Sequence, residues 1–253
     1  MARSSAKRAV GASKTSAPAS ARALSQQSVL RYGELLRQRI AAPEHSKGQR
    51  TRWSLLSAAA EVLEERGYHG LRVTDVNEKA RVSNALFYLY FKNKDEITAE
   101  VMTGFLDVLY ARSEDAPRPQ SIEESMFRAN YDYLRQYMAN PGLMRCLMQF
   151  GDESESFRRV WRETDRRWAE RVVKRLAREP ELAKRDINEL FAEVTALGMM
   201  VDAFLRSVYV EKEAPTTGYA KAIAPDVVSL ALFLTRLWVR AIYGREMRWS
   251  PDP

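Results

Sequence analysis

The chain has few residues of the kinds that support metal or covalent chemistry. Its 253 residues include one cysteine, Cys146, and two histidines, His45 and His69. A single cysteine excludes an internal disulfide, a cysteine-based zinc site and an iron–sulfur cluster, and it is typical of a reducing compartment. Two isolated histidines leave no relay of nucleophile, base and orienting group. We therefore expect no cofactor, no metal and no enzymatic activity.

Long apolar runs are also missing. No stretch approaches the roughly 18 consecutive apolar residues that a membrane span requires, and the first residues lack the apolar stretch of a secretory signal. Apolar residues nevertheless make up 45% of the chain and aromatic residues 10%, which is enough to bury a sizeable core. These features predict a folded, cytoplasmic protein with no membrane partner.

Acidic residues are scarce at one end of the chain. Residues 1–52 contain eleven lysines and arginines but only two acids, Glu34 and Glu44, whereas the whole chain has a net charge of +7. Residues 53–253 therefore carry a small net negative charge. An asymmetry of this kind indicates a polyanionic partner such as nucleic acid or an anionic membrane surface. A basic tail that only aids solubility is the alternative.

The first segment of the chain has a composition that does not support a folded core. Residues 1–24 are rich in Ala, Ser, Lys and Arg and contain no acid, so we expect a disordered basic tail. An organelle transit peptide has a similar composition. The helix expected in the next segment argues against a transit peptide. Residues 25–47 are expected to form an extra N-terminal helix and a linker, because apolar side chains recur there at helical spacing: Val29, Tyr32, Leu36 and Ile40.

The rest of the sequence has the periodicity of α-helices, and no segment shows the alternation typical of a strand. Pairs that form capping boxes mark helix starts at Asn93–Glu96, Ser121–Glu124 and Asp186–Glu189. Gly67 stands where a left-handed residue ends a helix. We predict an all-α protein of about nine or ten helices, over residues 50–66, 73–80, 84–90, 94–109, 121–138, 140–151, 153–178, 186–212 and 225–243.

Two of these helices are short and are joined by a tight connection around Arg81, Val82 and Ser83, which is the pattern of a helix-turn-helix. The second helix of such a motif needs apolar anchors on its inner side and polar or basic groups on its outer side and flanks. The expected anchors are Val76, Ala80, Val82, Phe87 and Phe91. The expected outward-facing residues are Asn84, Ala85, Leu86, Tyr88 and Tyr90, with Lys92 and Lys94 just beyond.

The segment from about Arg52 to Ile97 resembles the DNA-binding domain of the TetR family of bacterial transcriptional regulators. The resemblance is carried by Gly67-Tyr68, by Val82-Ser83, and above all by the block Phe-Tyr-x-Tyr-Phe-Lys-x-Lys-Asp-x-Ile that ends at Ile97. It implies an all-α fold with an N-terminal helix-turn-helix DNA-binding domain, residues 48–97. A larger helical domain for effector binding and dimerisation, residues 98–253, would follow.

The resemblance also implies a function, namely a ligand-responsive repressor that binds a palindromic operator in double-stranded DNA as a homodimer. Lys94 and Tyr88 are expected to hold phosphates, and Asn84 is expected to approach a base edge. A packing role is the alternative for Tyr88 and Tyr90. The full set of expected DNA contacts is Arg72, Thr74, Ser83, Asn84, Ala85, Leu86, Tyr88, Tyr90, Lys92 and Lys94.

The chain departs from the usual family pattern at several of these positions. Arg72 stands where a capping Thr is usual, and Asn77 where Ala is usual. Arg81 replaces a Gly in a turn that favours a positive φ, and Ala85-Leu86 replaces Gly-Thr. These residues leave the operator sequence open. They also keep a second interpretation available, that of a helical dimeric interaction protein with a weakened DNA-binding module.

The C-terminal helices suggest two further sites. One is a set of aromatic and methionine residues that suits an adaptable pocket for a small apolar effector: Tyr133, Tyr137, Met144, Met148 and Trp168. Ordinary core packing is the alternative for these residues. The other is formed by apolar stripes on the last two long helices, which suit a dimer contact in the form of a four-helix bundle: Met200, Phe204, Leu234 and Trp238. A place in the internal core is again the alternative.

Overall fold

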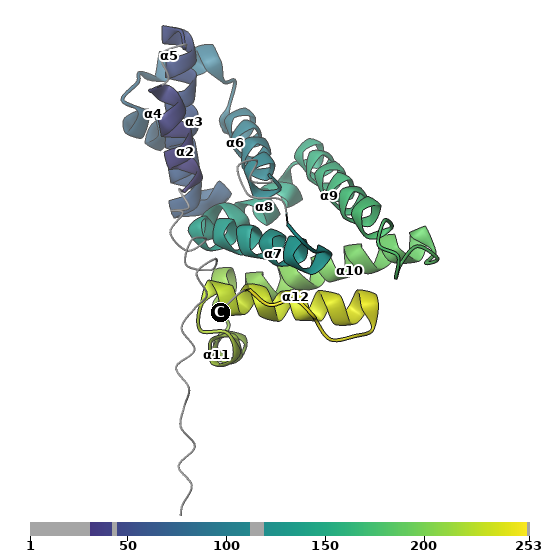
Figure 1. Cartoon of the computed structure of the whole chain (residues 1–253). Coiled ribbons are helices and arrows are strands. Elements are labelled where there is room, and N and C mark those ends of the chain that lie inside the picture. Colours follow the sequence, from purple (N-terminus) through teal and green to yellow (C-terminus); the bar gives the residue numbers. More distant parts are fainter. Residues whose placement is uncertain (1–30, 42–44, 112–118, 252–253) are drawn as a thin grey trace, which may run out of the picture. The chain divides into compact units, whose positions relative to one another are not determined.

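Every regular element in the part of the chain that the structure describes is a helix, as the periodicity predicted (Figure 1). The structure is a computed structural model, and it describes residues 31–41, 45–111 and 119–251. The elements are α2 (Tyr32–Ile40), α3 (Lys47–Gly70), α4 (Val73–Ala80), α5 (Asn84–Tyr90), α6 (Lys94–Leu109), α7 (Ile122–Ala139), α8 (Pro141–Glu153), α9 (Glu155–Leu176), α10 (Ile187–Leu205), η1 (Arg206–Glu211), α11 (Ala214–Ile223) and α12 (Val227–Tyr243).

Side-chain caps fix most of the helix starts where the sequence placed them. The side chain of Asn93 accepts a hydrogen bond from Glu96 N at 2.9 Å, and that of Ser121 accepts one from Glu124 N at 3.0 Å. Asp186 caps α10 in the same way, with Glu189 N at 3.0 Å. Each cap satisfies a backbone N–H that has no partner inside the helix. The starts of α6, α7 and α10 are therefore local properties of the sequence.

Three boundaries differ from the predicted ones. Helix α3 starts three residues early because Ser46 caps it, and Gly67 interrupts it with φ at 74° before a last turn to Gly70. The helix predicted to reach residue 212 changes at Leu205 into a π-helical turn, η1. Helix α11 was not predicted. It begins with a proline in its first turn, but its threonines and Gly218 are weak helix formers, so its periodicity was faint.

Helix α2 packs on α3 and carries the chain to the edge of the DNA-binding segment. Leu36 is buried as expected, and Tyr32 packs against Phe105 with ring centroids 5.6 Å apart. Tyr32 N donates a hydrogen bond to the buried Asn140 side chain at 2.8 Å. The predicted tail, residues 1–24, and the predicted helix start at 25–30, with Val29, lie outside the described residues.

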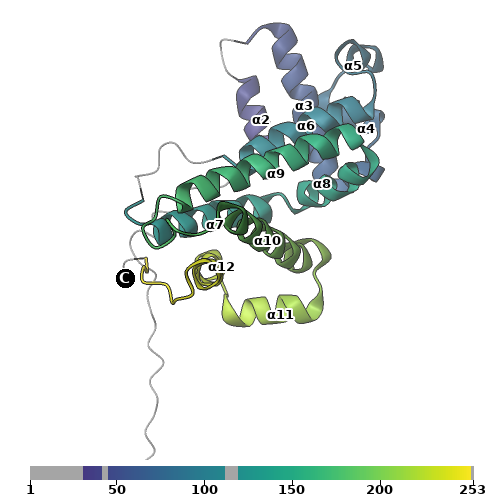
Figure 2. The same ribbon diagram turned by 90° about the vertical axis from the view of Figure 1, so that its right-hand side faces the viewer.

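The C-terminal half is built from helices that pack side by side around α7. Figure 2 looks nearly along α12 and shows α7 and α10 beside it, with α9 above them and α11 below. Helix α12 packs chiefly on α7, and α10 packs on α9. The C-terminal segment is tied back by Glu123, which accepts from Arg248 N at 2.8 Å and pairs with Arg245 at 2.5 Å. Helices α7, α9 and α10 border the cavity described below.

Helices α3 and α8 pack with their backbones very close together, and this contact links the DNA-binding segment to the C-terminal half. The Glu64 carboxylate caps the start of α8, because it accepts from Gly142 N and Leu143 N at 2.8 Å each. Cys146 donates its S–H to the Leu63 carbonyl at 3.3 Å, and burial raises the pKa of this thiol to about 12, so it stays a protonated donor. The backbones approach so closely that a β-carbon at Gly142 would overlap the Glu64 carbonyl oxygen.

We expect Gly142→Ala to destabilise the protein by about 1–3 kcal/mol, because an inserted methyl group must push two helix backbones apart. Chemical unfolding followed by circular dichroism measures this change. Gly218→Ala in α11 is the matched control, since an added β-carbon there has no atom within 4 Å. The control should be neutral or slightly stabilising. Equal stability of Gly142→Ala and the wild type would contradict the assigned role of this contact.

Candidate nucleic-acid interface and internal cavity

Helices α4 and α5 form the predicted helix-turn-helix. Arg81 ends α4 in the left-handed conformation, with φ at 56°, as the sequence comparison with glycine-containing turns implied. Val82 N donates to the Asn77 carbonyl at 3.0 Å, and the Ser83 hydroxyl accepts from Leu86 N at 3.2 Å. A non-glycine residue in this conformation costs free energy. The turn geometry is therefore maintained in spite of arginine.

Buried aromatic and aliphatic side chains hold α5 in place. Val76, Phe87 and Phe91 are fully buried, as expected, whereas Ala80 and Val82 are only half-buried. Arg52 from α3 fixes the end of α5: its guanidinium donates to the Tyr90 carbonyl at 3.3 Å, pairs with Glu100 and lies 4.6 Å from the centre of the Phe91 ring. This packing leaves the other side of α5 exposed among the described residues.

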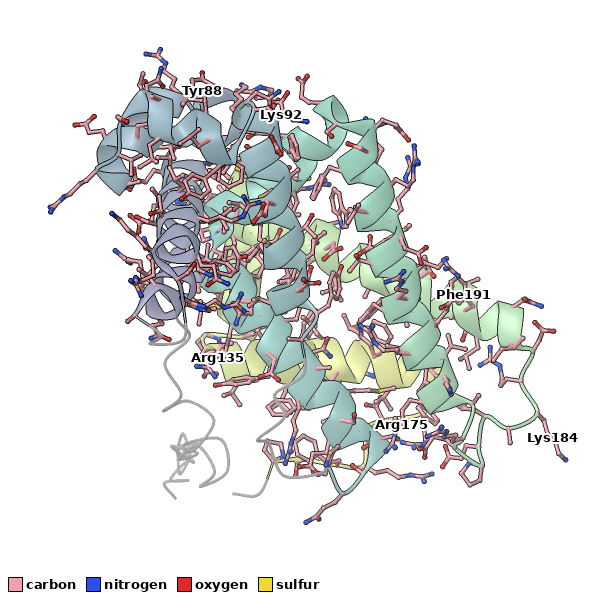
Figure 3. The ribbon with its side chains drawn as sticks, turned by 90° about the horizontal axis from the view of Figure 1, so that it is seen from above. Tyr88, Lys92, Arg135, Arg175, Lys184 and Phe191 are labelled. Atoms are coloured by element: carbon pink, nitrogen blue, oxygen red, sulfur yellow. The ribbon has the colours of Figure 1, made fainter. Side chains whose placement is uncertain are left out.

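The exposed side of α5 carries most of the predicted base-reading residues. Asn84, Ala85 and Tyr88 are exposed, while Leu86 and Tyr90 are half-buried. Tyr90 lies beside the start of α3, close to Gly48, which is the position expected of a packing residue. Leu89 is 79% exposed on the same helix and is not among the predicted contacts, because an apolar residue between two tyrosines gives no signal of its own. Tyr88 and Lys92 project from the same side of the molecule in Figure 3.

A buried amide links α4 to the base-reading end of α5. Asn77 is 6% exposed, and its Nδ2 donates to Oδ1 of Asn84 at 3.1 Å. Oδ1 of Asn77 has no hydrogen-bond partner among the described residues. A buried polar atom without a partner is unfavourable. The pair thus restrains the orientation of the Asn84 side chain at some cost in stability.

The remaining predicted contacts lie around this motif. Arg72 and Thr74 are exposed at the start of α4, and Arg72 makes no capping hydrogen bond. Lys92 is exposed. Lys94 is the first residue of α6, and its Nζ lies 4.4 Å above the ring of Tyr68. The Ser83 oxygen already accepts a hydrogen bond as a helix cap, so its hydroxyl proton is what remains for a partner.

A cavity of about 590 Å³ lies in the C-terminal half, between α7, α9, α10 and the end of α6. Tyr133 and Trp168, both predicted to contact an effector, line it. Tyr137, Met144 and Met148 are not among its lining residues, which corrects that part of the prediction. Met144 is buried in α8, and the sulfur of Met148 accepts from Arg206 at 3.3 Å.

The cavity wall includes acidic groups that the sequence analysis did not single out. The Tyr110 hydroxyl donates to Asp165 at 2.6 Å, and the Tyr133 hydroxyl donates to Asp202. Burial raises the pKa of Asp202 to about 6 and also raises the pKa of Asp165. Burial likewise raises the pKa of both tyrosines well above the usual range, so they remain donors. On the sequence, these aspartates looked like ordinary charges of solvated helices.

The residues predicted for a dimer contact fall into two groups. Met200 is 41% exposed, and Phe204 is half-buried beside Phe233, with ring centroids 6.3 Å apart. Leu234 and Trp238, in contrast, are buried within the chain, because this side of α12 packs on α7 or lines the cavity. They therefore belong to the internal core, the alternative that the sequence left open. Phe233 and Leu237 are the half-buried apolar residues on the other side of α12.

In the described ranges, no group of three or more histidine, cysteine, aspartate or glutamate side chains is placed to hold a metal ion. No single described helix is long and apolar enough to cross a membrane. The pair α11 and α12, bent by 95°, meets that test jointly on length and composition.

Comparison with known proteins gives matches of two kinds. The family model of the bacterial regulatory proteins of the tetR family matches residues 55–101. The uncharacterized HTH-type transcriptional regulator YdgC of Bacillus subtilis is 43% identical over 60 residues, which cover 24% of this chain and 31% of that protein. The HTH-type transcriptional repressor KstR2 of Mycobacterium tuberculosis is 30% identical over 92 residues, 35% of this chain and 46% of KstR2.

The alignments with these two relatives thus span about a third to a half of their length. The fold extends further than the sequence identity. A TetR-like transcriptional regulator from Rhodococcus sp. RHA1 superposes with a TM-score of 0.55 at 19% identity, over 80% of this chain and 100% of that one. The matched residues contain the helix-turn-helix described above, and the resemblance seen in the sequence is confirmed for this segment: residues 55–101 match the DNA-binding domain of the tetR family of bacterial regulatory proteins.

Proposed function

We propose that this protein is a sequence-specific DNA-binding transcriptional repressor that binds a palindromic operator as a homodimer and responds to a small effector. One observation carries the proposal, the exposed face of α5 held rigidly by buried anchors and flanked by Lys92 and Lys94. A short helix of this kind fits the major groove, and lysines beside it neutralise phosphates. The match of residues 55–101 to the tetR family model supports the same function.

The exposed side chains of α5 define how the operator would be read. Asn84 offers an amide to base edges, with its Oδ1 already engaged by Asn77. Ala85 and Leu89 present methyl groups, which suit contacts with thymine methyls in the major groove. Tyr88 and Lys94 are suited to phosphates, which position the protein without reading sequence. The proposed operator preference thus rests on few polar contacts and several apolar ones.

Dimer formation is proposed through the outer sides of α10 and α12. Their exposed or half-buried apolar residues include Met200, Phe204, Phe233 and Leu237. Two copies that pair these helices would form a four-helix interface and would place two recognition helices on half-sites about 34 Å apart. Leu234 and Trp238 are left out of this surface because they are buried within one chain.

Effector response is proposed to pass through α6. This helix starts with Lys94 beside the DNA-binding motif and ends at Tyr110, which lines the cavity. Its 16 residues span about 24 Å at 1.5 Å per residue. A ligand that shifts Tyr110 therefore moves a rigid element that carries a proposed phosphate contact. The alternative of a weakened DNA-binding module is less well supported, since the turn, the Ser83 cap of α5 and the buried aromatic anchors are formed.

The phosphate role of Lys94 predicts a defined effect on salt dependence. Lys94→Ala should weaken binding to all duplexes to a similar extent and reduce the slope of log affinity against log salt by about one. Fluorescence anisotropy over a salt series measures both quantities. Lys184→Ala is the matched control, because Lys184 is exposed and projects away from Tyr88 and Lys92 in Figure 3. An unchanged slope for Lys94→Ala would remove Lys94 from the interface.

The amide pair between α4 and α5 predicts a change in sequence preference. Asn77→Ala frees the Asn84 side chain, so the set of duplexes selected from a random pool should broaden while the salt slope stays the same. Because the substitution also removes a buried oxygen without a partner, the unfolding midpoint should not fall. Asn84→Ala should broaden the selection at the same base pair. Identical preferences for wild type and Asn77→Ala would refute the positioning role.

The proposed interface predicts an effect on oligomeric state. Met200→Glu places a carboxylate between two copies, where burial of an unpaired charge costs several kcal/mol. Light scattering at micromolar concentration should show a dimeric wild type and a monomeric variant. Ile187→Glu, at an exposed position at the start of the same helix, is the control and should remain dimeric. A monomeric wild type would contradict the proposed assembly.

A further inference from the structure

The cavity has a wall of aromatic rings that surrounds buried carboxylates. Tyr110 and Trp168 are 6.3 Å apart, as are Tyr110 and Tyr133, and Trp168 meets Trp238 edge to face at 6.1 Å. Asp165 from α9 and Asp202 from α10 belong to the same wall. A volume of about 590 Å³ is in the range of sites for small organic molecules. The lining is therefore apolar in bulk, with carboxylates at Asp165 and Asp202 on α9 and α10 and a third, Asp132, on α7.

The two carboxylates have hydrogen-bond donors but no cationic partner. Asp165 and Asp202 accept from tyrosine hydroxyls, and within the described part of the chain neither forms a salt bridge with lysine, arginine or histidine. Arg206 is the nearest basic influence on Asp202, and it pairs with Glu211 at 3.3 Å. Uncompensated buried carboxylates are costly. A cation inside the cavity would compensate them.

Arginines also occur at the cavity: Arg128 of α7 is half-buried and pairs with Glu124 at 2.5 Å, and the others lie at the exposed edge. Arg162, Arg166 and Arg171 are exposed residues of α9. Arg166 is already paired with Glu163 at 2.9 Å and with Glu170. Exposed charges interact weakly with a ligand because water and salt screen them, whereas charges inside a cavity are screened much less. The inner aspartates therefore dominate the choice of ligand charge.

An unpartnered donor in the wall is an independent sign of an occupant. The indole N–H of Trp238 is buried and has no acceptor among the described residues, and Trp238 lines the cavity at 6% exposure. A buried N–H without an acceptor is unfavourable. An acceptor atom of a bound molecule, or a water in the cavity, would satisfy this N–H.

We propose that the cavity binds an organic cation, an apolar molecule whose positively charged nitrogen lies between Asp165 and Asp202 against the surrounding aromatic rings. The carboxylates supply the charge that the cation pairs with. The faces of Tyr110, Tyr133 and Trp168 add cation–π attraction. The inference rests on the proposed effector role of this cavity, and it names the class of the effector.

The ionisation of Asp202 gives this binding a predictable pH dependence. Burial and the neighbouring Asp165 raise the pKa of Asp202 to about 6, while the Tyr133 hydroxyl and Arg206 oppose the shift. Tyr110 and Tyr137 also face this region, and their raised pKa keeps them neutral. Asp202 therefore loses its charge as the pH falls through about 6. Affinity for a permanently charged cation should fall with it.

Three twelve-carbon probes that differ only in their head group test the proposal: dodecyltrimethylammonium, dodecanol and dodecanoate, each below its micelle-forming concentration. Tryptophan fluorescence and calorimetry with the full chain measure binding. We expect the cation to bind about tenfold or more tightly than either other probe at pH 7.5, and its affinity to fall about fourfold at pH 5.5, where roughly a quarter of Asp202 stays ionised. Preference for dodecanoate, equal binding of all three, or binding of none would overturn the proposal.

Single substitutions localise the effect. Asp202→Asn and Asp165→Asn should each weaken binding of the cation about tenfold, and Asp202→Asn should remove most of the pH dependence. Glu163→Gln is the matched control, because it neutralises an acid on the outer side of the same helix as Asp165, where Glu163 pairs with Arg167 at 2.8 Å. The control should bind as the wild type does. A loss in Glu163→Gln as large as in Asp202→Asn would refute the cavity site.

A separate measurement distinguishes this inference from the proposed function. Operator binding is followed by anisotropy with and without saturating dodecyltrimethylammonium. Cation binding that the aspartate variants weaken, with no change in DNA affinity, would support the ligand class and contradict the effector role. Loss of DNA binding on adding dodecanoate but not the cation would contradict the ligand class and support the effector role.

Discussion

The close approach of α3 and α8 is the constraint on which the rest of the structure depends. Gly142 lets the two helix backbones meet, and the Glu64 carboxylate caps α8 at the same point. Helix α3 carries the helix-turn-helix, and α8 leads into the helices around the cavity. A residue with a side chain at position 142 would separate them. The alignment of the DNA-binding motif with the cavity therefore rests on backbone contact, which is stiffer than contact between flexible side chains.

The helices themselves were predictable because their signals are local. Capping residues such as Asn93 and Ser121 act on the backbone of their own helix, and Arg81 stands in a turn whose conformation follows from its neighbours. Long-range features were not predictable in the same way. The faint helix α11 and the π-helical turn η1 depend on packing against α10, α12 and α8. Periodicity alone does not contain that information.

The two proposed sites likewise combine features that local signals predict with features that depend on long-range packing. The outward side of α5 followed from a motif, although the exposure of the apolar Leu89 could not be predicted from its residue type. In the cavity, methionines suggested a pocket by their type alone, yet Met144 and Met148 fill space elsewhere. Asp165 and Asp202 gave no sequence signal, because charged residues at helical spacing usually face water. Only the packing of α7, α9 and α10 brings them into one wall.

The two proposed sites use opposite charges in opposite surroundings. Around α5, Lys92 and Lys94 lie at a surface, where water screens them and where many weak phosphate contacts add up over a long polyanion. In the cavity, two carboxylates are held by Tyr110 and Tyr133 away from bulk water, where a single opposite charge is attracted strongly. Surface charge suits recognition of an extended polymer, and buried charge suits selection of one small molecule. Helix α6 joins Lys94 to Tyr110. A movement of Tyr110 in the cavity would therefore be transmitted to Lys94 at the DNA-binding surface, and no surface charge would have to change.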